Sequence, residues 1–291
     1  MRIATYEHQG RLQVGQVSDD GQHVTPFRLS ADQAQHGALP LIEAAAAGQP
    51  LPETDGAARV ALAEVRLRAP LPRPRRNLWC VGRNYHAHAK ELASSVFKDS
   101  AAKTDVWPIV FTKVPECVVG PADAVELPGA AVSEQIDYEA ELAVVIGQGG
   151  KNIARADAMA HVYGYTIVND VTARDVQMRH QQWDMGKSFD TFCPMGPWLV
   201  TADELDGRST RVRCWVNGEL RQDGPTENMI FDIPTLIETV SRGITLLPGD
   251  VIATGTPAGV GMGLTPPRYL RSGDVVRVEI DGIGSIENRF V

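Results

Sequence analysis

Seven short apolar segments between residues 79 and 290 constrain the fold of this 291-residue chain more than any other feature. Runs of this length, rich in Val, Ile and aromatic residues and bounded by Gly, Pro, Asn or Asp, are typical of β-strands. Asn217-Gly218 and Asp281-Gly282 stand where two-residue hairpin turns are expected. We therefore predict a mixed or antiparallel β core, not a doubly wound sheet. The predicted strands are 79–82, 108–113, 141–147, 163–170, 211–222, 249–255 and 274–290.

Helical patterns are fewer in this part of the chain. Residues 157–161 predict a short helix, and residues 233–241 predict a longer one with Asp232 as its N-cap and Pro234 in its first turn. The strands and helices together predict an α+β fold.

The first 69 residues have a pattern of their own. Strands are expected over 2–6 and 12–17, a hairpin turn at Asp20-Gly21 and a helix over 41–47. Residues 70–77 are rich in Pro and Arg, which favours an extended linker. We therefore expect a small N-terminal α+β domain over 1–69, a linker over 70–77 and a catalytic domain over 78–291.

Composition narrows the possible partners. The formal net charge of -8 argues against a nucleic-acid-binding protein. The chain shows neither a leader-like N-terminus nor an apolar run long enough to cross a membrane, so we expect a cytoplasmic protein. The four cysteines lack the spacing of a zinc site, and Cys193 has no nearby histidine that would make it a nucleophile.

Two glycine-rich segments do not match nucleotide-binding motifs. Gly186-Lys187-Ser188 ends like a phosphate-binding loop, but Gln181 stands where that loop requires glycine. The glycines of residues 255–263 do not follow the dinucleotide-binding spacing, so we expect a shaped loop there.

Three carboxylates suggest a metal site. Glu139 and Glu141 are two positions apart, so on a strand they point the same way, and Asp170 ends another predicted strand. Three oxygen ligands suit Mg²⁺, Mn²⁺ or another hard divalent cation. The alternative is that these acids decorate a solvent-facing strand. Asp137 shares the alternation, but we expect it to support the site or begin the strand.

Two further features suggest catalysis. His88 and Glu91 are adjacent on one face if their segment is helical, and such a carboxylate raises the basicity of an imidazole. Lys187 lies in a loop-like segment, where its charge is suited to stabilise an anionic substrate or an enolate. The alternatives are a surface His–Glu pair and an exposed lysine.

Five separated motifs resemble the fumarylacetoacetate hydrolase family in its bacterial form with a small N-terminal domain. The motifs are GRNYHAHAKE, DYEAELAVVIG, NDVTARDVQ, GKSFDTFCPMGP and ATGTPAGVG, in this order along the chain. The resemblance implies a mixed β-sheet roll and a homodimer. It also implies a metal held by Glu139, Glu141 and Asp170, and a His88–Glu91 dyad. Substrate contacts are implied for Arg174, Gln177, Lys187 and Thr256, with Arg83 and Tyr85 as further candidates.

The resemblance points to a metal-dependent hydrolase that cleaves the C–C bond of a 2,4-dioxo acid. The expected substrate is an acylpyruvate such as maleylpyruvate or fumarylpyruvate, in aromatic catabolism, and the products are pyruvate and a carboxylic acid. The first alternative is an oxaloacetate decarboxylase, or an isomerase or dehydratase of a 2-oxo acid, acting through the same metal-enolate site. The second is a metal-binding sensor without catalysis. Residues 92–108 are longer than in the shortest family members, so we expect them to reshape the pocket.

Overall fold

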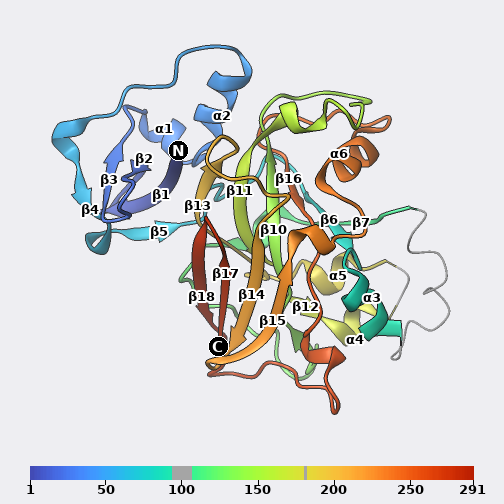
Figure 1. Ribbon diagram of the computed structural model, residues 1–291. Helices are drawn as coiled ribbons and strands as arrows, with labels where there is room; N and C mark the ends of the chain where they lie inside the picture. The colour runs from blue at the N-terminus through green and yellow to red at the C-terminus, as the bar shows by residue number, and fades with distance from the viewer. Residues whose placement is uncertain (94–106, 180–181) are drawn as a thin grey trace.

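A computed structural model describes residues 1–93, 107–179 and 182–291 of the chain. Strands dominate and helices are few, so the predicted α+β class is confirmed (Figure 1). The strands are β1 Arg2–His8, β2 Arg11–Val17, β3 His23–Pro26, β4 Val60–Ala61, β5 Arg66–Arg68, β6 Leu78–Gly82, β7 Ile109–Lys113, β8 Val118–Val119, β9 Ile136–Asp137, β10 Ala140–Ile146, β11 Val162–Asn169, β12 Thr172–Ala173, β13 Cys193–Thr201, β14 Arg211–Val216, β15 Glu219–Pro225, β16 Val251–Ala253, β17 Val275–Ile280 and β18 Gly284–Arg289. The α-helices are α1 Ala31–Ala34, α2 Leu39–Ala46, α3 His86–Ala93, α4 Arg174–Gln177, α5 Asp184–Lys187 and α6 Ile233–Ser241.

One twelve-stranded sheet runs through most of the molecule, in the order β4-β3-β2-β1-β13-β11-β10-β16-β6-β7, with β5 beside β1 and β8 beside β13. The pairs β16–β6 and β13–β8 are parallel and the other pairs are antiparallel, so the predicted mixed sheet is confirmed. All seven residues of β10 are buried, because this strand lies at the centre of the sheet.

The N-terminal strands continue the same sheet. Arg2 and Ile3 of β1 pair with Val200 and Leu199 of β13. Residues 70–77 form neither helix nor strand, yet Arg75 makes an ion pair with Glu43. The arginine next to it, Arg76, pairs with the buried Asp250. This segment is therefore anchored, and the domain boundary expected there remains a prediction.

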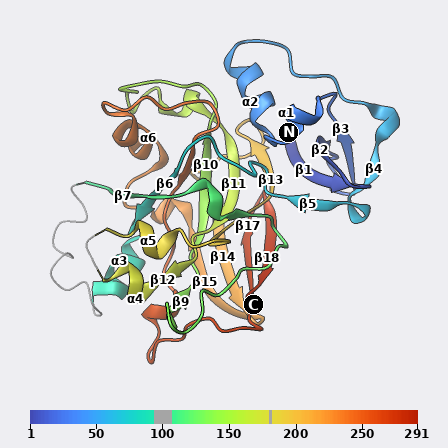
Figure 2. The same ribbon diagram turned by 180° about the vertical axis from the view of Figure 1, so that it is seen from behind.

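A second sheet of four strands, β15-β14-β17-β18, packs on the central strands of the long sheet (Figure 2). Burial alternates along β14 and β17, as expected for strands with one face against a core. Asn217 and Gly218 both adopt positive φ, 51° and 81°, and join β14 to β15 in the predicted hairpin.

Helix α6 has the predicted bounds, and its N-cap is the predicted one. Oδ1 of Asp232 accepts a hydrogen bond from the Thr235 amide at 2.9 Å. The helix predicted over 157–161 is a 3₁₀ turn, Ala158–His161. The strand predicted over 249–255 shortens to β16, since the chain leaves the sheet after Ala253. None of the described helices combines the length and apolar character needed to cross a membrane.

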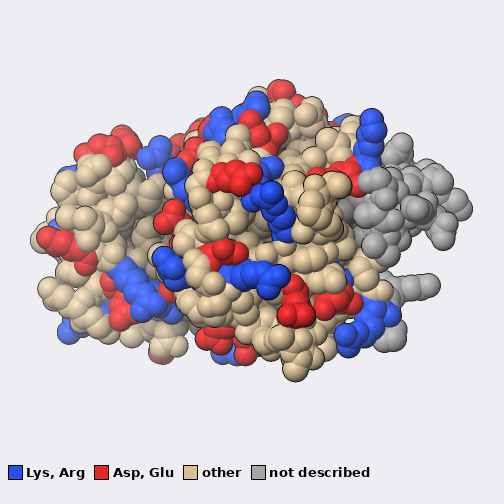
Figure 3. Space-filling view, turned by 90° about the horizontal axis from the view of Figure 1, so that it is seen from below, with Lys and Arg blue, Asp and Glu red and all other residues tan. Residues whose placement is uncertain are grey.

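Figure 3 shows one face of the molecule, on which acidic and basic side chains are interspersed. On the four-stranded sheet, the ion pairs Arg211–Asp223 and Arg213–Asp281 join partly exposed side chains.

Candidate active site

The candidate site lies at one edge of the long sheet, and strand direction explains why. β10 is antiparallel to both β11 and β16, and β6 is parallel to β16. Strands β11, β16 and β6 therefore end at the edge where β10 begins. This brings Asp170, Gly255 and Gly82 to the same place as Glu141.

Glu139, Glu141 and Asp170 converge at this edge. Each offers one carboxylate oxygen, and these atoms all lie within 4.8 Å of one another. The three side chains are buried, so the alternative of a solvent-facing acidic strand is wrong. Their convergence does not come from strand alternation alone, because the strand breaks after Asp137 and resumes at Ala140. Glu139 reaches the cluster from this bend.

Lys187 is buried against two of the three carboxylates. Its Nζ donates to Oε2 of Glu139 at 2.8 Å and to Oδ2 of Asp170 at 2.7 Å. Nη1 of Arg174 lies 2.7 Å from Oε1 of Glu139. The alternative of an exposed lysine is therefore wrong, and positive charge surrounds part of the cluster.

Sequence reasoning missed Lys113, the last residue of β7. Its fully buried Nζ lies 2.8 Å from Oδ1 of Asp170. It also donates to the backbone oxygens of Val171, at 3.2 Å, and of Lys187. The sequence offers one weak indication of its role, namely that Lys113 ends the apolar segment Ile109–Lys113. A lysine at the end of a strand is also common where it has no function.

Glu139 has cationic partners in the site, but Glu141 has none among the described residues. Burial raises the pKa of Glu139, but Lys187 and Arg174 outweigh burial and hold this pKa well below its usual range. Burial and the nearby Asp170 and Glu139 raise the pKa of Glu141 well above its usual range. Glu141 accepts a hydrogen bond from the Gly255 amide at 2.8 Å and has no ion pair with any described residue. A buried, oxygen-only donor set with an uncompensated carboxylate fits a hard divalent cation.

His88 and Glu91 form the predicted pair on α3. Nδ1 of His88 lies 3.1 Å from Oε2 of Glu91, and the Gly259 amide donates to Oε1 of Glu91 at 3.0 Å. His88 is buried and lines the same cavity as Glu139 and Glu141, so the alternative of a surface pair is wrong. With the Nδ1 proton on the Glu91 side, Nε2 of His88 is the basic atom of the ring.

The expected substrate residues do not all face the cavity. Arg83, Arg174, Gln177 and Thr256 line it, whereas Tyr85 is buried outside its lining. Nη2 of Arg174 is buried without a hydrogen-bond partner in the described structure, and Nη1 donates to Oε1 of Gln177 at 3.2 Å. The hydroxyl of Thr256 donates to the backbone oxygen of Ala140 at 2.9 Å, which fixes the start of β10.

The glycine-rich loop after β16 holds three carboxylates through backbone amides. Gly255 donates to Glu141 and Gly259 to Glu91, while Gly261 and Met262 donate to Asp137 at 2.7 Å and 2.9 Å. The sequence predicted a shaped loop here but not these bonds. Gly259 also needs its lack of a side chain, since a Cβ would lie 1.8 Å from the Arg221 carbonyl oxygen.

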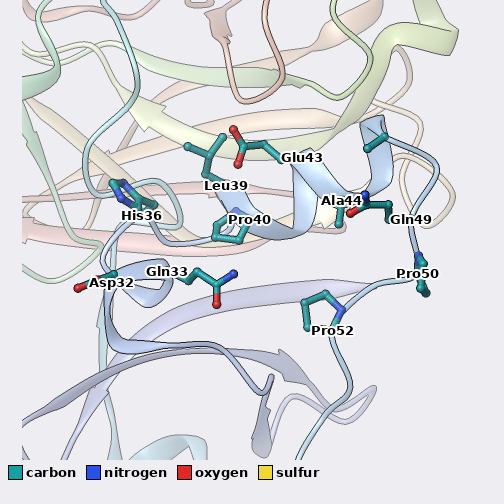
Figure 4. A pocket seen from close by; sticks show the side chains of 11 residues that line it. Asp32, Gln33, His36, Leu39, Pro40, Glu43, Ala44, Gln49, Pro50 and Pro52 are labelled. Atoms are coloured by element: carbon teal, nitrogen blue, oxygen red, sulfur yellow. The ribbon is translucent and has the colours of Figure 1, made fainter.

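The cavity between these residues has a volume of about 20 Å³. A larger cavity of about 620 Å³ lies between α1, α2 and the loop that carries Pro50 and Pro52 (Figure 4). Its lining holds no cluster of converging carboxylates, so the smaller cavity is the candidate active site.

Two remaining expectations concern other parts of the chain. Cys193 is fully buried at the start of β13 and does not line the cavity, in agreement with a structural role. Most of the 92–108 segment, residues 94–106, lies outside the described residues.

Comparisons with known proteins identify relatives of this chain. A family model described as fumarylacetoacetate (FAA) hydrolase C-terminal matches residues 77–291. The chain is 45% identical to the oxaloacetate tautomerase YisK of Bacillus subtilis, over 100% of both proteins. It is 48% identical to the human mitochondrial oxaloacetate tautomerase FAHD2A, over 78% of this chain and 70% of the human protein.

Solved structures agree with these relatives. A fumarylacetoacetate hydrolase from Exiguobacterium antarcticum superposes with a TM-score of 0.83 at 42% identity, over 100% of this chain and 99% of that chain. A 5-carboxymethyl-2-hydroxymuconate delta-isomerase from Mycobacterium smegmatis superposes with a TM-score of 0.78 at 34% identity, with the same coverage.

Proposed function

The chain belongs to the fumarylacetoacetate hydrolase family, and we propose that within this family it is an oxaloacetate tautomerase. Such an enzyme interconverts the keto and enol forms of oxaloacetate. The observation that carries the proposal is the 45% identity with the tautomerase of Bacillus subtilis over the full length of both proteins. The proposal favours the isomerase alternative over acylpyruvate hydrolysis, the reaction expected from the sequence motifs.

The residues of the site fit a bound metal. Glu139, Glu141 and Asp170 would hold Mg²⁺ or Mn²⁺ through their converging oxygens. When bound, the ion supplies Lewis-acid polarisation of the 2-oxo group of the substrate.

The chain's own residues account for binding and proton transfer. Arg174 presents the unpaired Nη2 to a substrate carboxylate, and Lys187 presents an ammonium group to the oxygen at C2. Nε2 of His88 removes a proton from C3, while Glu91 stabilises the imidazolium that forms. Lys187 stabilises the enolate charge on the C2 oxygen. Transfer of the proton from His88 to that oxygen completes the enol, so no bond between carbon atoms breaks.

Acylpyruvate hydrolysis is the second candidate. The complete His88–Glu91 pair favours it, because the same base can deprotonate a water molecule that attacks the C4 carbonyl. The similar structure from Exiguobacterium antarcticum is that of a fumarylacetoacetate hydrolase. Oxaloacetate decarboxylation has less need of a base, and a non-catalytic sensor would need none.

One experiment separates these reactions. Purified protein loaded with Mg²⁺ is given keto oxaloacetate, and enol formation is followed by ultraviolet absorbance while pyruvate is measured in parallel samples. A tautomerase accelerates enol formation without accelerating pyruvate release. Pyruvate release from oxaloacetate at the same rate would instead identify a decarboxylase, and pyruvate release from acetylpyruvate or fumarylpyruvate would identify a hydrolase. His88→Asn provides the matched control.

The homodimer and the cytoplasmic location both remain predictions. Analytical ultracentrifugation tests the homodimer, because it would give a mass twice that of the 31.6 kDa chain. Cell fractionation tests the second.

A further inference from the structure

Two aromatic rings form an apolar wall of the active-site cavity. Phe111 comes from β7, and Trp183 immediately precedes α5. Their ring centroids lie 5.4 Å apart with the planes inclined by 59°. Nζ of Lys187 lies 4.8 Å from the centroid of Phe111, so the wall stands directly beside the charged part of the site.

The position of this wall is fixed by contacts on both sides. Asp184, the residue after Trp183, accepts hydrogen bonds through Oδ1 from the Thr112 hydroxyl at 2.6 Å and from the Thr112 amide at 3.2 Å. Thr112 follows Phe111 on β7. The carbonyl of Trp183 accepts from the Gly186 amide at 2.9 Å, inside the helix that also carries Lys187. One junction between α5 and β7 therefore places both rings and Lys187.

Gly82, at the end of β6, makes the room that the indole ring occupies. A Cβ at this position would lie 2.4 Å from Cζ3 and 3.0 Å from Cη2 of Trp183. A contact of 2.4 Å is too short for two carbon atoms, so a side chain at residue 82 would force the indole to move. Gly82 and Trp183 are thus a complementary pair in the lining of the cavity.

We infer that Trp183 sets the maximum length of the substrate. The converging carboxylates, Lys187 and Arg174 would recognise the 2-oxo acid head group, and the indole, which lines the same cavity, would limit how far a longer chain could extend. A rigid apolar wall rejects extra methylene groups by steric overlap, which is worth about tenfold or more in discrimination. The inference rests on the proposed function in one respect, namely that the ligand is a 2-oxo acid or a close mimic.

Binding tests this inference without any turnover. Isothermal titration calorimetry on the Mg²⁺-loaded protein measures Kd for oxalate, which contains the head group alone, and for 2-oxoglutarate and 2-oxoadipate, which add methylene groups. For Trp183→Ala we expect the ratio of the Kd for 2-oxoadipate to the Kd for oxalate to fall at least about tenfold. Trp215→Ala, a tryptophan of β14 outside the cavity, is the matched control and should leave the ratio unchanged.

An unchanged ratio in folded Trp183→Ala would overturn the inference, as would an equal shift in Trp215→Ala. Because calorimetry needs no reaction, the result is independent of tautomerase activity. A protein that fails to tautomerise oxaloacetate but shows the expected shift would refute the proposed function and retain the length limit.

A second pair of variants covers the case in which Trp183→Ala does not fold. Gly82→Ala places a methyl group against the indole, so we expect it to weaken 2-oxoglutarate binding at least about fivefold more than oxalate binding. Adding Trp183→Phe removes the indole atoms that the methyl group meets and should restore the ratio. If the double variant did not restore the ratio of the two Kd values, the methyl group at residue 82 would not act through contact with the indole of Trp183.

Discussion

Nε of Arg174 lies 2.8 Å from Oδ2 of Asp137, and both side chains are fully buried. The same guanidinium reaches Glu139 through Nη1, so Asp137 holds the cation that flanks the carboxylate cluster. Asp137 is not among the converging carboxylates, which agrees with a supporting role.

Asp137→Asn is therefore expected to act on stability more than on metal binding. Loss of one partner from a buried ion pair lowers the free energy of unfolding by about 3 kcal/mol or more. Urea denaturation measures this effect. Asp223→Asn, which breaks an outer ion pair, should cost less than about 1 kcal/mol.

Glu139→Gln should weaken metal binding directly and should also lower stability, because Glu139 is ion-paired with Lys187 and Arg174. It removes an oxygen from the converging set, so we expect Mg²⁺ affinity to fall at least about tenfold and activity to be lost. Calorimetric titration of both variants with Mg²⁺ makes the comparison. Equal losses of affinity in Asp137→Asn and Glu139→Gln would contradict the roles assigned to the two acids.

His88→Asn and Glu91→Gln test the base. We expect His88→Asn to lower kcat by about 10²- to 10⁴-fold, since it removes the atom that moves the proton. Glu91→Gln keeps an acceptor for the Gly259 amide but removes the charge that stabilises the imidazolium, so its loss should be smaller. Oxalate affinity of the Mg²⁺-loaded variants is the control. If His88→Asn lowered the affinity for oxalate by the same factor as it lowered kcat, His88 would have a binding role instead.

Glu141→Gln should stabilise the metal-free protein. Glu141 is buried beside Glu139 and Asp170, and its pKa is raised well above the usual range by burial and by those charges. Its replacement by a neutral amide removes this repulsion, so we expect a higher Tm in EDTA than for the wild type. Mg²⁺ should raise the Tm of the variant less than that of the wild type, because tighter binding gives a larger stabilisation.

The control for this experiment is Glu126→Gln, an exposed glutamate, which should behave as the wild type in both conditions. If Glu141→Gln had a lower Tm than the wild type in EDTA, the hydrogen bond from the Gly255 amide to the Glu141 carboxylate would stabilise the protein more than the repulsion between the carboxylates destabilises it.

Lys113→Met tests the residue that sequence reasoning missed. The substitution removes one of the two cations that pair with the buried Asp170, since Lys187 still donates to Oδ2, and breaking a buried ion pair costs up to about 3 to 5 kcal/mol of unfolding free energy. Urea denaturation in EDTA measures this cost without metal. Lys151→Met, at an exposed lysine, should change stability by less than about 0.5 kcal/mol. Equal stability of the two variants would show that Lys113 is not needed to hold Asp170.

Local features of the fold were predictable from the sequence. The hairpin at Asn217-Gly218 and the helix that begins after Asp232 depend on residues within a few positions of each other, so their signals lie in short segments. The carboxylate cluster was also predictable, because Glu139 and Glu141 are two positions apart and Asp170 directly follows the adjoining strand β11.

The remaining features depend on residues that are far apart in the chain. The pairing of β1 with β13 joins residues 2 and 200, and no local pattern specifies that partner. Lys113 reaches Asp170 across 57 positions, and the Gly259 amide reaches Glu91 across 168. Hydrogen bonds from backbone amides cannot be predicted from residue types, because every residue except proline carries an amide donor.

The loop after β16 has a consequence for how this protein can evolve. Its amides at positions 255, 259 and 261 donate to three different carboxylates, so the spacing between these positions matters, and each position also needs glycine because a Cβ there would lie within 2.7 Å of a neighbouring atom. A substitution at one position changes a single residue, whereas one inserted residue would move every later amide donor away from its carboxylate acceptor. We therefore expect relatives to keep both the length of this loop and its three donor glycines, and to vary at the other positions.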